Sequence, residues 1–109
     1  MENAAKNCNS MAEIRAEIDR MDDLILPLMA ERAGYVAQAP KFKSTIEDVI
    51  VQKRIDEIAF RMRDEAANYG LNQKLAENIW RALIDQHIKF EQDEFRKMYG
   101  GDKNKEKDA

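Results

Sequence analysis

The strongest constraint on the fold is a long apolar stripe in the first third of the chain. Its members alternate steps of three and four residues: Met11, Ile14, Ile18, Met21, Ile25 and Leu28. This spacing keeps the side chains on one face of an α-helix, at roughly 3.5 residues per repeat. Ser10, with Glu13 three residues later, has the pattern of a capping box. We therefore predict a helix from about Ser10 to about Lys43.

An arginine interrupts this stripe. Continuing the same steps leads to Arg32, and then to Tyr35, Ala39 and Phe42. An unpaired cation in a buried seam costs several kcal/mol unless a negative group meets it. Two interpretations remain open: an ion pair with an acidic residue of another helix, or a site for an anionic ligand.

Two prolines, Pro27 and Pro40, lie inside the predicted first helix. Proline removes a backbone donor and clashes with the preceding turn, so we expect a kink or a local break at each. Pro40 is also a candidate for the end of the helix.

The remainder of the chain predicts a connector and two more helices. In the connector, Ser44 and Thr45 can each cap a new start, with Glu47 or Asp48 as the matching acid. A second helix is predicted over about residues 49–69, ending at Gly70, which can adopt the left-handed conformation of a C-cap. Asn72 is a predicted N-cap, and a third helix follows over about residues 73–99.

Composition supports a single small all-α domain. The chain has 109 residues, 36% of them charged, with only four glycines and two prolines. We predict a flexible leader at 1–9, a helical domain at 10–99 and a flexible tail at 100–109. The net charge of −3 argues against a nucleic-acid partner, and the first ten residues show no export signal or membrane anchor. With Cys8 as the single cysteine, we expect no disulfide and a cytoplasmic location.

The length of the first helix predicts a dimer. A helix of some 30 residues is roughly 45 Å long, which is more than two shorter helices can cover. A chain of this size also buries only a modest core by itself. We therefore expect an intertwined homodimer in which the long helices of the two chains cross.

Several cations lie where they could form a shared anion site. Lys43 follows Arg32 by eleven residues, which on a continuous helix places both on one face about 16 Å apart. Arg15 precedes Arg32 by seventeen residues, roughly 25 Å, so it could serve only the site of a partner chain. The alternatives are a solvated Lys43 at a helix end and a surface Arg15 paired with Asp19.

Three further residues are candidates for the same site. Arg54 borders the apolar stripe of the second helix and is either a pocket charge or a rim charge. His87 and Glu91 are one turn apart on the third helix, where they form either a local hydrogen-bonded pair or part of a site. Two such ligands fall short of a zinc site, so we predict no metal. The sequence also has no glycine-rich phosphate loop and no nucleophile elbow.

These residues also carry a family resemblance. The run IRAEIDRMDDLILPLMAERAGYVAQAPKFK, residues 14–43, resembles the first helix of the all-helical (type II) chorismate mutases. The chain is similar along nearly its whole length to the branch of that family that includes isochorismate pyruvate lyase. The specific part is the pattern Ile-Arg, Ile-Asp, Asp-Leu-Ile, Leu, Arg and Lys, with cations at 15, 32 and 43.

The resemblance implies an intertwined helical homodimer with two shared active sites, no cofactor and a small dicarboxylate substrate. Arg32, with Arg15 from the partner subunit, would hold the two carboxylates of chorismate. Lys43 and Glu91 would be the catalytic groups at the ether oxygen. The implied substrate-binding residues are Arg15, Arg32, Lys43, Arg54, His87 and Glu91.

The family reaction converts chorismate to prephenate, on the route to the aromatic amino acids, in one pericyclic step without nucleophile or cofactor. Three positions depart from the mutase pattern. Ile55 stands where many mutases have a glutamate that binds the substrate hydroxyl, and Val51 stands where an acid is also seen. Glu91 stands where the lyase and the simpler mutases have glutamine. We rank chorismate mutase first, isochorismate pyruvate lyase (isochorismate to salicylate and pyruvate) second, and a non-enzymatic helical dimerisation module third.

Overall fold

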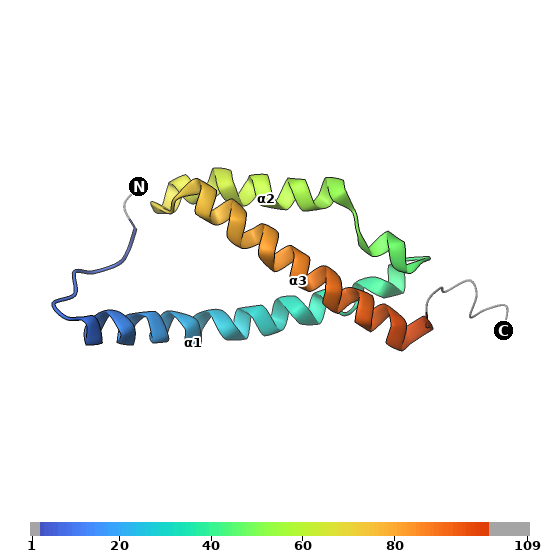
Figure 1. Ribbon diagram of the computed structural model, residues 1–109, viewed down its shortest axis with the longest axis horizontal. Helices are drawn as coiled ribbons and strands as arrows, with labels where there is room; N and C mark the ends of the chain where they lie inside the picture. The colour runs from blue at the N-terminus through green and yellow to red at the C-terminus, as the bar shows by residue number, and fades with distance from the viewer. Residues whose placement is uncertain (1–2, 101–109) are drawn as a thin grey trace.

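The fold is all-α, as the sequence predicts. A computed structural model describes residues 3–100, so most of the predicted tail lies outside the described residues. It has three long helices, α1 (Met11–Val36), α2 (Gln52–Ala66) and α3 (Gln73–Tyr99). Figure 1 shows α1 and α2 with roughly parallel axes and opposite chain directions, and α3 crossing obliquely from the end of α2 to the end of α1.

The start of α1 confirms the predicted N-cap. The Ser10 hydroxyl accepts a hydrogen bond from the Glu13 backbone N–H at 3.1 Å. The Glu13 carboxylate accepts in return from the N–H of Asn9 at 2.8 Å, one residue before the cap. The helix then continues through Pro27, so the local break expected there is absent.

The predicted end of the first helix is wrong. α1 ends at Val36, and the chain turns into a short 3₁₀ helix, η1 (Ala39–Phe42). Pro40 is four residues after Val36; it has no N–H to donate to the Val36 carbonyl, and its ring would clash with that carbonyl. Lys43 follows η1 in an extended conformation. The predicted continuous helix, with Arg32 and Lys43 on one face, is therefore not formed.

The connector is more structured than the sequence predicts. It contains a second 3₁₀ helix, η2 (Ile46–Val49), at whose start the Asp48 carboxylate accepts from the N–H groups of Ser44 and Thr45. The next two residues, Ile50 and Val51, are extended. α2 consequently begins at Gln52, later than the predicted start near residue 49.

The junction between α2 and α3 follows the predicted signals. After α2, a 3₁₀ turn, η3 (Ala67–Tyr69), leads to Gly70, whose φ of 67° is the left-handed conformation expected of a C-cap. The Asn72 side chain accepts from the Leu75 N–H at 2.9 Å, so the predicted N-cap of α3 is confirmed.

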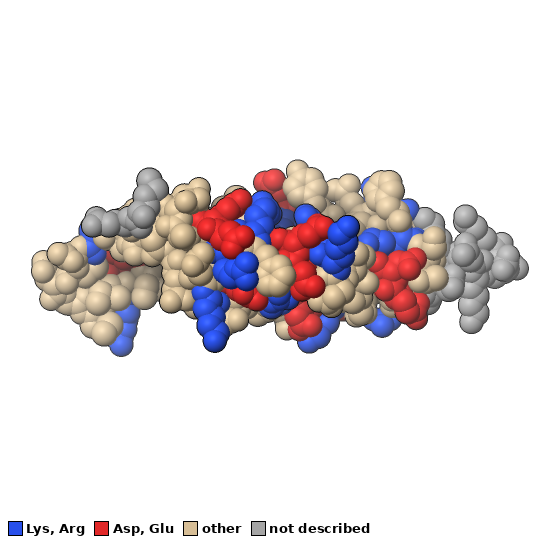
Figure 2. Space-filling view, turned by 90° about the horizontal axis from the view of Figure 1, so that it is seen from above, with Lys and Arg blue, Asp and Glu red and all other residues tan. Residues whose placement is uncertain are grey.

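The buried core is small and lies mainly between α2 and α3. Its apolar members are Val49, Ala59, Ala66, Ala76, Ile84 and Phe95. The ring of Phe95 also meets that of Tyr99 edge to face, with centroids 5.3 Å apart. On the outer surface of α2 and α3, the guanidinium group of Arg81 links the two helices. It forms ion pairs with the carboxylate of Asp56 on α2 at 3.1 Å and with that of Glu77 on α3 at 2.9 Å. Figure 2 shows cations and anions interspersed on this face, with no continuous basic surface.

The apolar stripe of α1 remains uncovered within one chain. No residue of α1 is buried, and Ile18 and Leu28 are 53% and 68% exposed. The radius of gyration is 18.2 Å, whereas a compact chain of this length would have about 13 Å. The stripe is thus available to a partner, and the homodimer stays a prediction. Among the described helices, none is both long and apolar enough to cross a membrane.

Candidate active site

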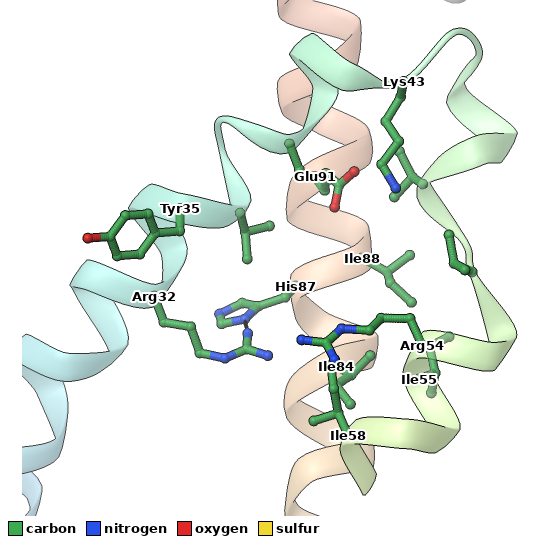
Figure 3. A pocket seen from close by; sticks show the side chains of 14 residues that line it. Arg32, Tyr35, Lys43, Arg54, Ile55, Ile58, Ile84, His87, Ile88 and Glu91 are labelled. Carbon is green, nitrogen blue, oxygen red and sulfur yellow. Dashed lines mark hydrogen bonds between the residues drawn. The ribbon is translucent and has the colours of Figure 1, made fainter.

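A cavity of about 340 Å³ lies where the end of α1, the 3₁₀ helices η1 and η2, α2 and α3 meet (Figure 3). This volume suits a small ligand. The structure brings five of the six predicted site residues to its wall: Arg32, Lys43, Arg54, His87 and Glu91. Much of the remaining wall is aliphatic: Val36, Ala39, Val49, Val51, Ile55, Ile58, Ile84 and Ile88.

Arg32 reaches the cavity from the last turns of α1 and is partly buried. Its Nη1 donates a hydrogen bond to Nδ1 of His87 on α3. Within residues 3–100 it forms no ion pair, so the described residues supply no acidic partner of the kind that one sequence interpretation required. Burial, together with the charge of Arg54, lowers the pKa of Arg32. A partly buried cation without a carboxylate partner favours the binding of an anion.

Arg54 approaches Arg32 from the first turn of α2, and Figure 3 shows the two guanidinium groups pointing toward one another. Its carboxylate contact is Glu57 at 3.9 Å, between side chains that are 63% and 52% exposed. An exposed pair at that distance neutralises little charge. Two like charges, those of Arg32 and Arg54, therefore meet at the cavity. Arg54 is both a rim charge and a pocket charge, so both interpretations apply.

Lys43 enters from the connector after η1. Its Nζ donates to the backbone carbonyl of Asp48 at 3.1 Å, which ties the side chain to the η2 turn. In Figure 3 the ammonium group lies beside the carboxyl group of Glu91. Pro40 ends α1 and so allows the chain to bring Lys43 to this wall.

Glu91 is the buried acid of the site, with 9% of its surface exposed. Its Oε2 has no hydrogen-bond partner within the described chain. Burial raises the pKa of the carboxyl group, and the charge of Lys43 acts in the opposite direction without cancelling the effect. A larger fraction of Glu91 is therefore protonated at a given pH than of an exposed glutamate. Its free oxygen is available to a ligand.

His87 lies one turn before Glu91 on α3. Its Nδ1 accepts from Arg32, and the described structure has no hydrogen bond between His87 and Glu91. The local pair that the four-residue spacing allowed is thus not formed. Burial, and secondly the charge of Arg32, lower the pKa of His87, so the ring is neutral near pH 7.

Arg15 is not at this cavity. It is exposed on the second turn of α1, and seventeen residues of continuous helix separate it from Arg32 by roughly 25 Å. Its predicted role needs a second chain and stays a prediction.

Several wall residues were not predicted from the sequence. Ile84 and Ile88 share one face of α3 with His87 and Glu91, since steps of three and four residues separate them. That spacing was a signal that could have found them. Tyr35, predicted as part of the seam, also lines the cavity.

A second cavity, of about 800 Å³, lies between the leader and the first half of α1. Its cations Lys6 and Arg20 both pair with Glu17, at 3.3 and 2.8 Å. It therefore lacks the unpaired charge of the first cavity. No group of three potential metal ligands occurs among the described residues.

Comparison with known proteins identifies the family. Residues 14–92 match the family described as chorismate mutase type II. The chain belongs to this family. It is also 26% identical over 83 residues to isochorismate pyruvate lyase from Pseudomonas aeruginosa, covering 76% of this chain and 82% of that protein. The resemblance drawn from the cations at 15, 32 and 43 is confirmed, and the residues that match the chorismate mutase family include all six candidate site residues.

Proposed function

We propose that this protein is a chorismate mutase, which rearranges chorismate to prephenate. The observation that carries the proposal is the cavity in which Arg32, Lys43 and Arg54 meet an aliphatic wall and the unpartnered Oε2 of Glu91. Chorismate carries one carboxylate on its cyclohexadiene ring and the other on its enolpyruvyl side chain, and the ether oxygen that joins the two parts can accept a hydrogen bond. The three cations, the aliphatic wall and the potential donor Glu91 together match these features.

In this proposal Arg32 binds one carboxylate of the substrate, which supplies the anion that the described residues do not place near this guanidinium group. Arg15 of the partner subunit binds the other carboxylate, and Arg54 adds positive charge at the rim. Lys43 and protonated Glu91 donate to the ether oxygen, whose negative charge grows as the carbon–oxygen bond breaks.

The rearrangement breaks one carbon–oxygen bond and forms one carbon–carbon bond within the same molecule. It needs no net transfer of protons or electrons. Catalysis therefore comes from holding the compact reactive conformer between fixed charges, which is catalysis by orientation. Donors aimed at the ether oxygen add electrostatic stabilisation of the transition state.

The proposal includes a homodimer. The apolar stripe of α1 is exposed along its length in one chain, and residues such as Ile18 and Ile25 are more than half exposed. A crossing of two α1 helices would bury this stripe and supply Arg15 to the opposite cavity. Sedimentation analysis of the purified protein at micromolar concentration tests this: a monomer at that concentration contradicts the shared site.

Isochorismate pyruvate lyase is the second candidate, and two observations favour it. Ile55 gives the cavity an aliphatic side chain where many mutases have the glutamate that binds the substrate hydroxyl, and Val51 does so where an acid is also seen. The similar protein from Pseudomonas aeruginosa bears that name.

Separate incubation of the purified protein with chorismate and with isochorismate distinguishes the candidates. Formation of prephenate supports the mutase, and formation of salicylate with pyruvate supports the lyase. Turnover of neither substrate contradicts both and leaves a helical dimerisation module.

A further inference from the structure

The hydrogen bond between Arg32 and His87 joins α1 to α3 across the cavity, between residues 55 positions apart. A guanidinium group can only donate, so Nδ1 of His87 must accept with its lone pair. The ring therefore carries its proton on Nε2, and its Nδ1 is committed to Arg32. This assignment follows from the chemistry of arginine.

We propose that His87 is a positioning residue, whose imidazole orients the guanidinium group of Arg32 toward the ligand carboxylate. The proposal concerns the anion site described above, so its catalytic part rests on the proposed function. The remaining N–H groups of Arg32 are then free to bind a carboxylate.

Arg32 needs such support because no carboxylate among residues 3–100 pairs with it. Arg54 faces it with a like charge, which acts to push the guanidinium group away from the cavity. A neutral acceptor holds the group without competing for its charge, whereas an acidic partner would neutralise the site. A half-buried arginine oriented in advance also loses less freedom when a ligand binds.

The surroundings favour the neutral ring. The groups around the cavity that carry or can carry charge are Arg32 and Tyr35 from α1, Lys43 from the connector, Arg54 from α2 and Glu91 from α3. Three of these are cations, and together with burial they disfavour a further positive charge. Protonation of His87 would also remove the lone pair that Arg32 uses.

Three variants of His87 test the proposal through turnover of the substrate that the protein accepts. The amide of His87→Asn places an acceptor near the position of Nδ1, that of His87→Gln near Nε2, and His87→Leu has none. We expect KM to rise about tenfold or more in His87→Leu and His87→Gln, with a smaller change in kcat, because binding through Arg32 is weakened. His87→Asn should stay within about threefold of wild type. Rescue by His87→Gln and not by His87→Asn would overturn the proposal, because it would mean that Nε2 contacts the ligand; so would wild-type kinetics in all three variants.

A double-mutant cycle with Arg32→Lys tests whether His87 acts through Arg32. Lysine keeps the charge but cannot reproduce the guanidinium geometry. In the Arg32→Lys background, His87→Leu should cause little further loss of kcat/KM. Full additivity of the two losses would contradict a role through Arg32.

A spectroscopic test does not depend on turnover. His87 is the single histidine, so its ring nitrogens give unambiguous ¹⁵N NMR signals in the full-length protein. In wild type at pH 7.5 we expect Nδ1 without a proton and Nε2 with one. In the Arg32→Met variant we expect this tautomer preference to be lost and the pKa of His87 to rise. A proton on Nδ1 in wild type would overturn the inference, even if the protein turned over neither substrate. Correct tautomers without turnover would contradict the proposed function alone.

Discussion

Replacing Glu91 with glutamine tests the chemistry of the cavity most directly. To donate a hydrogen bond to an ether oxygen, Glu91 must be protonated, whereas glutamine donates at any pH. Burial raises the pKa of Glu91 above its ordinary value of 4.5, and Lys43 only partly opposes this. In wild type, activity should therefore rise as pH falls from neutrality, until Glu91 is mostly protonated.

The size of the effect follows from the titration. Well above the pKa of Glu91, the protonated fraction falls about tenfold for each pH unit, and kcat/KM should fall with it. Glu91→Gln should show a nearly flat profile and, at pH 7.5, a rate equal to or above that of wild type.

The free energy of unfolding should also be higher at low pH, where Glu91 is protonated. A folded-state pKa above the unfolded value gives stability that is present below the unfolded pKa and is lost as pH rises through the folded one. The free energy of unfolding of wild type should thus decrease relative to that of Glu91→Gln as pH rises above about 4.5 and through the folded-state pKa of Glu91.

The assay is the initial rate of chorismate disappearance between pH 5 and 8, at constant ionic strength, for wild type and Glu91→Gln. His87 titrates in a neighbouring range, so the double variant with His87→Asn isolates the contribution of Glu91. If wild type and Glu91→Gln have the same dependence on pH, Glu91 is not the donor and the reasoning is refuted.

Three other predictions concern the cations and the end of α1. Arg32→Ala should lower kcat/KM by about 100-fold or more while the dimer stays folded; a monomeric or unfolded variant with an unchanged rate per folded site would make Arg32 a structural residue. Mixing inactive Arg15→Ala and Lys43→Ala chains should restore about a quarter of wild-type activity, because half of the dimers are mixed and each has one complete site; no rescue from proven heterodimers would exclude a shared site. Pro40→Ala should let α1 extend and draw Lys43 from the cavity, raising helical circular dichroism while lowering kcat/KM. Pro27→Ala, remote from the cavity, is the matched control: it should raise the melting temperature and leave kcat/KM unchanged. Equal activities of the two proline variants would contradict the positioning role of Pro40.

The sequence alone predicted the elements whose signals are local. Ser10 and Asn72 cap helices through side chains that bond to N–H groups three residues away, and Gly70 adopts the left-handed conformation that ends a helical segment. Such interactions lie within one turn of chain, so a pattern of residue types describes them fully. The apolar stripe of α1 was likewise predicted from the spacing of its residues along the chain.

The position of Lys43 depended on competition between signals. Periodicity continued the first helix to residue 43, but the missing N–H and the ring of Pro40 ended it at Val36. The two cations still share a cavity, although by a route through η1 and the connector that the pattern did not contain. The family pattern was therefore a better guide to the site than the projected helix face.

Tertiary structure decided what each charged group meets. The periodicity showed that Arg32 interrupts the apolar stripe, but it left open whether an acidic residue of another helix or an anionic ligand meets this cation. Its actual partner within the chain is the neutral ring of His87, 55 residues away, and its neighbour from α2 is the like charge of Arg54. Contacts of this kind depend on how α3 crosses α1 and α2, and no local spacing encodes that crossing.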